Sequence, residues 1–251
     1  MIYFGGIPYV LFILVTLGIA AWEYWQLFKK CGYNPSAVLI VGGAVALIAQ
    51  RALFGFAGAE ILLSLLLLAA TTYHLVDYER GRDQAATDFG ITLGGFFYIG
   101  WLGAYLVSLR GLPEGKWWVL LVLPAVWLAD AGAYLFGSWL GRHPLSPRLS
   151  PKKTWEGYFG GLLFGLLGGA FLAGLWHLMS PPVTALHGAL MGLFLAVLTP
   201  LGDLGESMFK RQAGQKDSSN IIPGHGGIFD RYDSWLWAAV LGYYLILWLH
   251  W

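Results

Sequence analysis

Charged residues and cysteine are both scarce in this sequence. Only 12% of its 251 residues are Asp, Glu, Lys or Arg, about half of the usual share in a soluble domain. A chain of this size could not bury so much apolar surface in water, which excludes an ordinary soluble enzyme and a disordered protein. The single cysteine, Cys31, excludes an internal disulfide and a cysteine-based zinc site. What remains is a polytopic helical membrane protein.

Long apolar runs recur along the whole chain. A membrane-spanning helix needs about 20 mostly apolar residues. The sequence predicts eight, at roughly Ile7–Phe28, Ser36–Gln50, Ala57–His74, Phe89–Leu109, Trp117–Leu140, Gly157–Leu178, Val183–Gly202 and Ser234–Trp251. We therefore expect an all-α membrane fold, with N-terminal helices over residues 1–115 and C-terminal helices with cytoplasmic catalytic loops over residues 116–251.

Basic residues concentrate on one side of this predicted topology. Of the 15 Lys and Arg residues, 12 fall on the odd-numbered loops between the predicted spans. Such an excess marks the cytoplasmic side, so both termini are expected on the opposite side. The compact chain shows no targeting segment, which favours a bacterial inner (plasma) membrane.

Glycine recurs every four residues along one predicted span. Gly157, Gly161, Gly165 and Gly169 form a small-xxx-small face that lets another helix backbone approach closely. Packing within a tight helical bundle is the simplest explanation. The alternative is that this face forms the interface of a homodimer, and we predict a homodimer.

The first long polar stretch covers residues 141–156. Its three prolines exclude a helix through its middle, and Lys152 and Lys153 lie near its end. Thr154 is placed to cap the following helix. The basic side chains are either substrate contacts or topology determinants that touch anionic lipid headgroups.

The second polar stretch, residues 202–233, is richer in carboxylates. Asp203, Glu206 and Lys210 are spaced to share one helix face. Asp230 and Asp233 are three residues apart where the last span begins. With Asp203 they predict an oxygen-rich site for a hard divalent cation such as Mg²⁺. For either aspartate alone, capping of a helix N-terminus is the simpler explanation.

Residues 223–227 read Pro-Gly-His-Gly-Gly. Glycines permit positive φ, and successive N–H groups in such a turn can surround phosphate oxygens. Alone, this stretch would be a flexible loop, and His225 is open to roles as ligand contact, proton carrier or hydrogen-bonding group. Together with nearby basic residues and carboxylates, it indicates phosphoryl or nucleotidyl transfer. Its position at the ends of apolar helices indicates one lipid and one water-soluble substrate.

Asp130 lies inside an apolar run. A carboxylate at membrane depth is a functional hypothesis by default. The alternatives are a pair with a basic residue, or a polar cavity that opens to the cytoplasm. Glu60 and His74 are weaker candidates, because they lie near span ends where snorkelling or interhelical bonding suffices.

Two blocks of sequence resemble a known family. The first is Ser207-x-x-Lys210-Arg211, then Lys216-Asp217, then Pro223-Gly224-His225-Gly226-Gly227-x-x-Asp230-Arg231-x-Asp233. The second runs from Asp130, through Ala131, Tyr134 and Gly137, to Ser150-Pro151-Lys152-Lys153-Thr154-x-Glu156-Gly157. Both resemble phosphatidate cytidylyltransferases (CDP-diacylglycerol synthases).

The resemblance extends from about residue 120 to the C-terminus. The first 115 residues are less diagnostic, although Trp22-Glu23-Tyr24 followed by Lys29 and Lys30 is similar to the family. Family members usually have a further hydrophobic helix before this motif, and its absence here is the reason to expect eight spans rather than nine.

The resemblance implies that phosphatidic acid and CTP react to give CDP-diacylglycerol and pyrophosphate. It implies Mg²⁺ as a cofactor, with K⁺ as a second cation nearby. The expected metal ligands are Asp203, Asp230 and Asp233. The expected catalytic residues are Lys210, Arg211, Asp230 and Asp233. The other expected substrate contacts are Asp130, Lys152, Lys153, Thr154, Ser207, Lys216, Asp217, Pro223, Gly224, His225, Gly226, Gly227 and Arg231.

Two other functions are compatible with parts of this sequence. A lipid kinase of the dolichol-kinase type would transfer the γ-phosphate of a nucleotide, but the full signature favours cytidylyl transfer. A transporter would use the carboxylates Asp130 and Glu60, but the ionisable residues gather at the cytoplasmic ends and no inverted repeat is visible. No nucleic-acid partner is expected.

Overall fold

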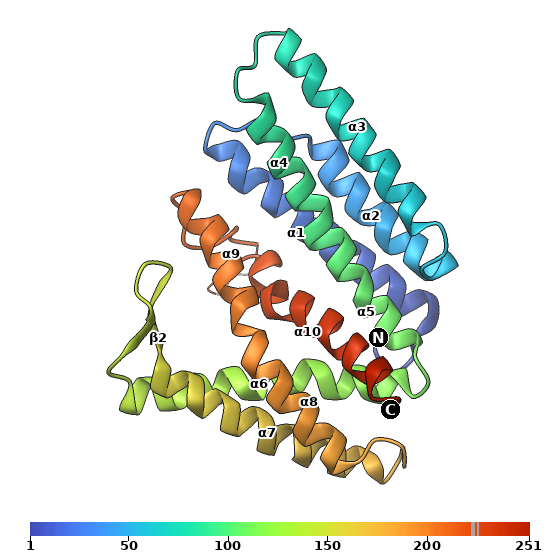
Figure 1. The fold of residues 1–251 in the computed structure, drawn as a ribbon, viewed down its shortest axis with the longest axis vertical. Helices are drawn as coiled ribbons and strands as arrows, with labels where there is room; N and C mark the ends of the chain where they lie inside the picture. Colours follow the sequence, from blue (N-terminus) through green and yellow to red (C-terminus); the bar gives the residue numbers. More distant parts are fainter. Residues whose placement is uncertain (222–223, 225) are drawn as a thin grey trace. The chain divides into compact units, whose positions relative to one another are not determined.

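The computed structural model describes residues 1–221, 224 and 226–251 (Figure 1). Over these residues its regular secondary structure is helical apart from one short hairpin, which confirms the all-α class. Seven helical segments are long and apolar enough to cross a membrane: Gly6–Lys30, Ala37–Phe54, Ala59–Glu79, Ala85–Gly111, Gly115–Leu140, Trp155–His177 and Ala185–Gln212. The chain is therefore an integral, polytopic membrane protein.

The predicted eighth span corresponds to helix α10 (Phe229–Trp248). This helix has 20 residues but is not among the seven apolar segments found in the described residues. Its first turns carry Asp230, Arg231 and Asp233, and Trp and Tyr replace aliphatic residues along its length. The count of seven thus differs from the expected eight, and a membrane crossing by α10 stays a prediction.

The chain divides into two compact units. One contains Tyr3–Ser108 and Phe209–Tyr232, and the other contains Leu109–Met208 and Asp233–Trp251. The divisions fall inside α9 (Pro200–Gln212) and inside α10. Residues 209–232 therefore group with the N-terminal helices.

The first unit consists mainly of the helices before residue 109, which pack through apolar side chains. The elements are α1 (Gly6–Lys30), α2 (Ala37–Phe54), α3 (Ala59–Glu79), α4 (Ala85–Gly95), the π-helix η1 (Phe96–Trp101) and the start of α5 (Leu102–Gly111). Leu47, Ala70 and Phe96 form a buried core cluster. The π-helix interrupts the span expected to run from Phe89 to Leu109, at a place where a Cβ on Gly100 would lie 2.5 Å from Ala44 Cα.

Aromatic rings hold residues 209–232 within this unit. The ring of Tyr24 on α1 lies 5.5 Å from that of Phe209 and 5.9 Å from that of Phe229, both edge-on. Tyr98 on η1 packs edge-on against Phe209 at 5.5 Å. Edge-to-face pairs at these separations add to the stabilisation from apolar burial. The segment that carries much of the sequence signature is thus anchored on α1 and η1.

The second unit is organised around close helix packing. It contains α6 (Gly115–Leu140), α7 (Trp155–His177), α8 (Ala185–Leu198) and most of α9. A Cβ on Gly161 of α7 would lie 3.0 Å from Ala129 O of α6, and one on Gly169 would lie 2.1 Å from Gly188 O of α8. The glycine face therefore packs inside the chain, which confirms the bundle interpretation and removes this face as support for a homodimer.

A β-hairpin connects α6 to α7 (Figure 1). Strand β1 (Pro144–Ser146) pairs antiparallel with β2 (Ser150–Thr154), with Pro144 opposite Thr154. The prediction that prolines exclude a helix here is confirmed, and a two-stranded ribbon tolerates them because each strand keeps an open edge. The Thr154 hydroxyl accepts a hydrogen bond from Gly157 N at 3.1 Å, so the predicted cap of the next helix is confirmed.

Candidate active site

A cavity of about 780 Å³ opens in the second unit. Its walls come from α6, the hairpin, the start of α7 and the start of α9. Four residues expected to bind substrate line it, together with the expected metal ligand Asp203: Asp130, Lys152, Lys153 and Thr154. The cavity thus brings together residues that lie up to 73 positions apart in the sequence.

Lys153 and Asp203 form an ion pair on the cavity wall. About a third of each side chain is exposed, so both stay accessible from the cavity. The pair holds the Lys153 ammonium at the wall instead of letting it extend into solvent. Asp130 is exposed toward the same cavity from α6, which matches the expectation of a polar cavity rather than a buried ion pair.

Glu156 fixes the base of the hairpin that carries the two lysines. Its carboxylate accepts hydrogen bonds from the backbone N–H groups of Arg142 and His143 at 3.1 and 3.2 Å. The His143 side chain also contacts it, at 2.5 Å. These contacts tie the first turn of α7 to the end of α6, and they fix the hairpin whose second strand presents Lys152 and Lys153.

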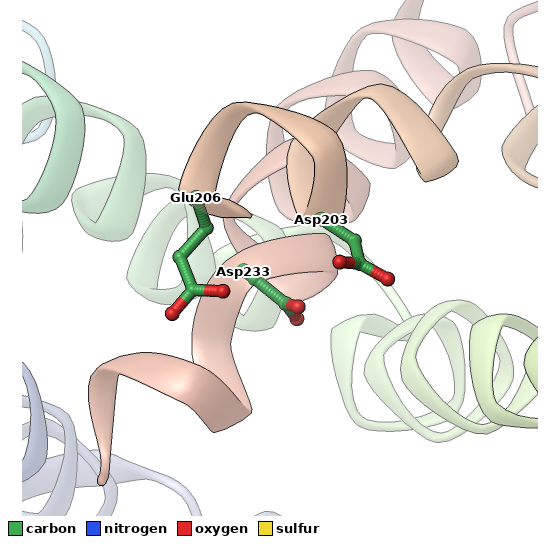
Figure 2. Close-up of side chains that lie close together, drawn as sticks. All are labelled: Asp203, Glu206 and Asp233. Atoms are coloured by element: carbon green, nitrogen blue, oxygen red, sulfur yellow. The ribbon is translucent and has the colours of Figure 1, made fainter. Parts of the chain in front are cut away.

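Three carboxylates gather beside this cavity. Asp203 and Glu206 project from α9 and Asp233 projects from α10, with one oxygen from each lying within 4.8 Å of the others (Figure 2). Glu206 is buried and the two aspartates are half-buried. The Ser207 hydroxyl donates to Asp203 Oδ1 at 3.4 Å. An all-oxygen, anionic donor set of this kind fits a hard cation such as Mg²⁺.

Burial and neighbouring negative charge both act on Asp233. It precedes the predicted span Ser234–Trp251. Burial, followed by the negative charge of Asp203, raises the pKa of Asp233 to about 7. Like charges held this close disfavour ionisation unless a cation offsets them. The electrostatics of the three carboxylates therefore favour a bound cation.

Asp230 belongs to a different network, in the first unit. Its Oδ1 accepts from Lys210 Nζ at 2.7 Å. Its Oδ2 accepts from Ser218 N at 3.0 Å, from the Ser218 hydroxyl at 2.9 Å and from Gly227 N at 2.7 Å. Asp230 was expected as a metal ligand, whereas here its two oxygens bind an ammonium group and the loop that precedes α10.

The remaining predicted residues lie around this loop. Gly224 and Gly226 have positive φ angles of 75° and 80°, as expected for a turn built on glycine. Gly227 is needed for space instead, because a Cβ there would lie 2.2 Å from the Ser218 hydroxyl oxygen. Four of the predicted site residues are exposed: Arg211, Lys216, Asp217 and Arg231. Pro223 and His225 lie outside the described residues.

Sequence reasoning left out two carboxylates. Glu206 was placed on the same face as Asp203 but not among the expected ligands, although its position one helical turn later was the available signal. Glu23 is buried in α1, and its side chain accepts four hydrogen bonds from residues 218–229. Its sequence signals were a carboxylate within an otherwise apolar span and the Trp22-Glu23-Tyr24 motif.

Comparison with known proteins agrees with the resemblance. Residues 1–249 match the cytidylyltransferase family, so the chain belongs to this family. A phosphatidate cytidylyltransferase of Pseudomonas aeruginosa is 37% identical, over 97% of this chain and 89% of the relative. Phosphatidate cytidylyltransferases of Synechocystis sp. and Bacillus subtilis are each 34% identical, over 97% and 96% of this chain and 89% and 90% of the relatives.

Proposed function

We propose that this membrane protein is a phosphatidate cytidylyltransferase, which converts phosphatidic acid and CTP into CDP-diacylglycerol and pyrophosphate. Its membership of the cytidylyltransferase family and the names of its full-length relatives support this activity. The observation that carries the proposal at the level of the site is the cavity, where Lys153 and Asp203 from separate sequence blocks meet.

The reaction is a substitution at phosphorus. A phosphate oxygen of phosphatidic acid forms a bond to the α-phosphorus of CTP, and the bond from that phosphorus to the bridging oxygen of the β-phosphate breaks. Pyrophosphate leaves with the electron pair. The attacking oxygen is already anionic, so no general base is needed and His225 has no required proton-transfer role. Catalysis then depends on positioning and on charge neutralisation.

The basic residues offset repulsion between two anionic substrates. Lys152 and Lys153 line the cavity and would bind phosphate oxygens there. Lys210, Arg211 and Arg231 are the further phosphate contacts expected from the signature, with Ser207 adding a hydroxyl. Thr154 acts mainly by capping α7, which fixes the strand that precedes it.

Asp203, Glu206 and Asp233 are the residues that would hold Mg²⁺. When bound, the ion would neutralise negative charge on the polyphosphate of CTP. Glu206 replaces Asp230 in this proposed set, because Asp230 is engaged by Lys210 and Ser218. A K⁺ ion nearby stays an expectation from the family resemblance.

We expect the protein to lie in the inner membrane of a bacterial cell, with the cavity facing the cytoplasm. The hairpin beside it carries Arg142, Arg148, Lys152 and Lys153, and loops rich in such residues stay on the cytoplasmic side. CTP would then reach the cavity from the cytosol, and phosphatidic acid from the surrounding bilayer. A homodimer also stays an expectation, now without the glycine face in its favour.

The alternative activities are less well supported. Neither the family match nor the names of the relatives favours a lipid kinase. For a transporter, Glu60 would have to line a path with Asp130, but the Glu60 side chain is exposed on α3 and does not line the cavity.

Labelled CTP distinguishes these activities. Purified protein in detergent is given phosphatidic acid, Mg²⁺ and CTP labelled at the α- or the γ-phosphorus. We expect α-label to enter the lipid and γ-label to leave as pyrophosphate, with neither transfer when phosphatidic acid is omitted. Entry of γ-label into lipid would make the protein a lipid kinase, and no transfer from either position would overturn the proposal.

A further inference from the structure

Glu23 is a fully buried carboxylate of the first unit. It lies near the end of α1, and its residue exposure is 0%. Its Oε1 accepts hydrogen bonds from the Ser219 hydroxyl at 2.6 Å and from Ile228 N at 3.1 Å. Its Oε2 accepts from the Ser218 hydroxyl at 3.3 Å and from Phe229 N at 2.7 Å.

These four contacts suit an ionised carboxylate. All four partners donate, and two of them are backbone N–H groups at the beginning of α10. The first N–H groups of a helix lack partners within the helix and carry partial positive charge. Glu23 therefore caps α10 from another helix, and it binds residues on both sides of the segment between Ser219 and Ile228.

The contact leaves no room for a side chain between Glu23 and the loop. A Cβ on Gly227 would lie 2.6 Å from each Glu23 carboxylate oxygen. The φ angle of Gly227 is not positive, so glycine is needed there for close approach and not for backbone conformation. The carboxylate thus directly contacts the backbone just before α10.

Ser218 links Glu23 to Asp230. Its hydroxyl lies 3.3 Å from Glu23 Oε2 and 2.9 Å from Asp230 Oδ2, while its N–H donates to Asp230. Gly227 is likewise enclosed by both carboxylates, since its N–H donates to Asp230. A displacement of Ser218 or of the start of α10 would therefore change the surroundings of Asp230 and the Lys210 ammonium that it binds.

We propose that Glu23 is a positioning residue for the reaction: it fixes the rotational phase of the first turn of α10, and with it the directions of Asp230 and Arg231. The inference rests on the proposed function, in which Arg231 binds phosphate and Asp230 holds Lys210, a further phosphate contact. Functional side chains must be held to within roughly 0.5 Å and 10–20°. A carboxylate that anchors the turn from α1 supplies this support.

Glu23→Gln tests the inference with little change in shape. The amide keeps one acceptor oxygen and turns an NH₂ group toward donors. We expect kcat per folded molecule to fall by about 10- to 100-fold, the range seen when a supporting hydrogen bond behind a functional group is lost. We also expect faster hydrogen exchange at the amides of Ile228 and Phe229. Glu60→Gln, the same change at an exposed carboxylate of the same unit, should alter neither quantity.

Ser219→Ala provides a second variant that removes one of the four donors to Glu23, along with the acceptor of Ile221 N, and keeps the Glu23 carboxylate. It should lower kcat less than Glu23→Gln and speed exchange at Ile228. Unchanged kcat and exchange in Ser219→Ala, or an effect of Glu23→Gln only on the amount of folded protein, would overturn the inference. Failure of the proposed function would appear separately, as a wild-type protein without cytidylyl transfer. The hydrogen-exchange measurements would still test whether Glu23 stabilises the beginning of α10.

Discussion

The acidic residues of the site fall into two groups with different surroundings. Asp203, Glu206 and Asp233 approach one another in the second unit. Glu23 and Asp230 instead accept several hydrogen bonds each in the first unit. The first arrangement favours a cation, because the three carboxylates repel one another. The second is already satisfied by donors and favours a supporting role.

Removing one carboxylate of the first group should stop catalysis without unfolding the protein. In Asp233→Asn the side-chain shape is kept, so the protein should extract and purify like wild type. We expect turnover to fall by at least about 100-fold, as when a preorganised electrostatic contact is removed. Initial rates of cytidylyl transfer, with Glu60→Gln as control, measure the effect. Near wild-type turnover would show that Asp233 holds no essential cation.

Lys153 should contribute to substrate binding through its charge. Its ammonium lies on the cavity wall beside Asp203, where an anionic substrate would meet it. Lys153→Ala is expected to raise the KM for CTP or for phosphatidic acid by about 10-fold, equivalent to one charge-assisted hydrogen bond. Arg148→Ala changes an exposed basic residue of the same connection and serves as control. Equal kinetics in the two variants would assign Lys153 to topology alone.

Single residues were predictable where their partners are near in sequence or share a pattern. The spacing of Asp203, Glu206 and Lys210 predicted one helix face. The cavity brings Asp130, Lys153 and Asp203 together. The role of Glu23 was not predictable, because its partners lie 195 to 206 residues away. No local pattern encodes a contact over such a separation.

At the scale of elements, the glycine face of α7 should limit what the bundle tolerates. A Cβ at position 169 would lie 2.1 Å from Gly188 O, whereas one at position 174 would lie 3.9 Å from its nearest neighbour. Gly169→Ala should destabilise the protein by about 1–3 kcal/mol through overpacking. Gly174→Ala, the matched control, should be neutral or stabilise by up to about 1 kcal/mol through helix propensity.

Thermal unfolding in detergent compares the two glycine variants. The midpoint should fall for Gly169→Ala and not for Gly174→Ala. Equal midpoints would mean that α7 and α8 separate without cost, which contradicts the packing described for these helices.

Helices were predictable because length and apolarity alone nearly determine a membrane span. The predicted runs agree with α1 to α3 and with α6 and α7 to within a few residues at most ends. The π-helix was not predictable from apolar patterning, which does not distinguish it from an α-helix; within it, Gly100 lies close to Ala44 on another helix. The hairpin was predicted only as a non-helical stretch. Prolines exclude a helix there, but they do not indicate which strands pair.

For the whole molecule, the membrane topology depends on α10. The charge bias, with 12 of 15 basic residues on one side, predicts that both termini lie outside the cytoplasm. That requires α10 to cross the bilayer in addition to the seven apolar segments. Without this crossing, the two termini would lie on opposite sides.

Thiol labelling in intact cells tests this topology. Cys31, the single cysteine, is exposed at the end of α1 on the predicted cytoplasmic side, so a membrane-impermeant maleimide should miss it until cells are permeabilised. In a Cys31→Ser background, Trp251→Cys should react in intact cells. Protection of that C-terminal thiol would place α10 on the cytoplasmic surface.

The contacts of Glu23 also set an order of events during biosynthesis. The ribosome completes α1 long before it reaches Ser218 and Phe229, which lie 195 and 206 residues later. Until then the nascent helix carries a carboxylate without its final donors, and burial in lipid would be costly. Glu23 lies near Lys29 and Lys30 in the sequence, at the same end of α1. This end can therefore stay in the headgroup region until the later residues are made. Translation of almost the whole chain must therefore precede the final docking of α1.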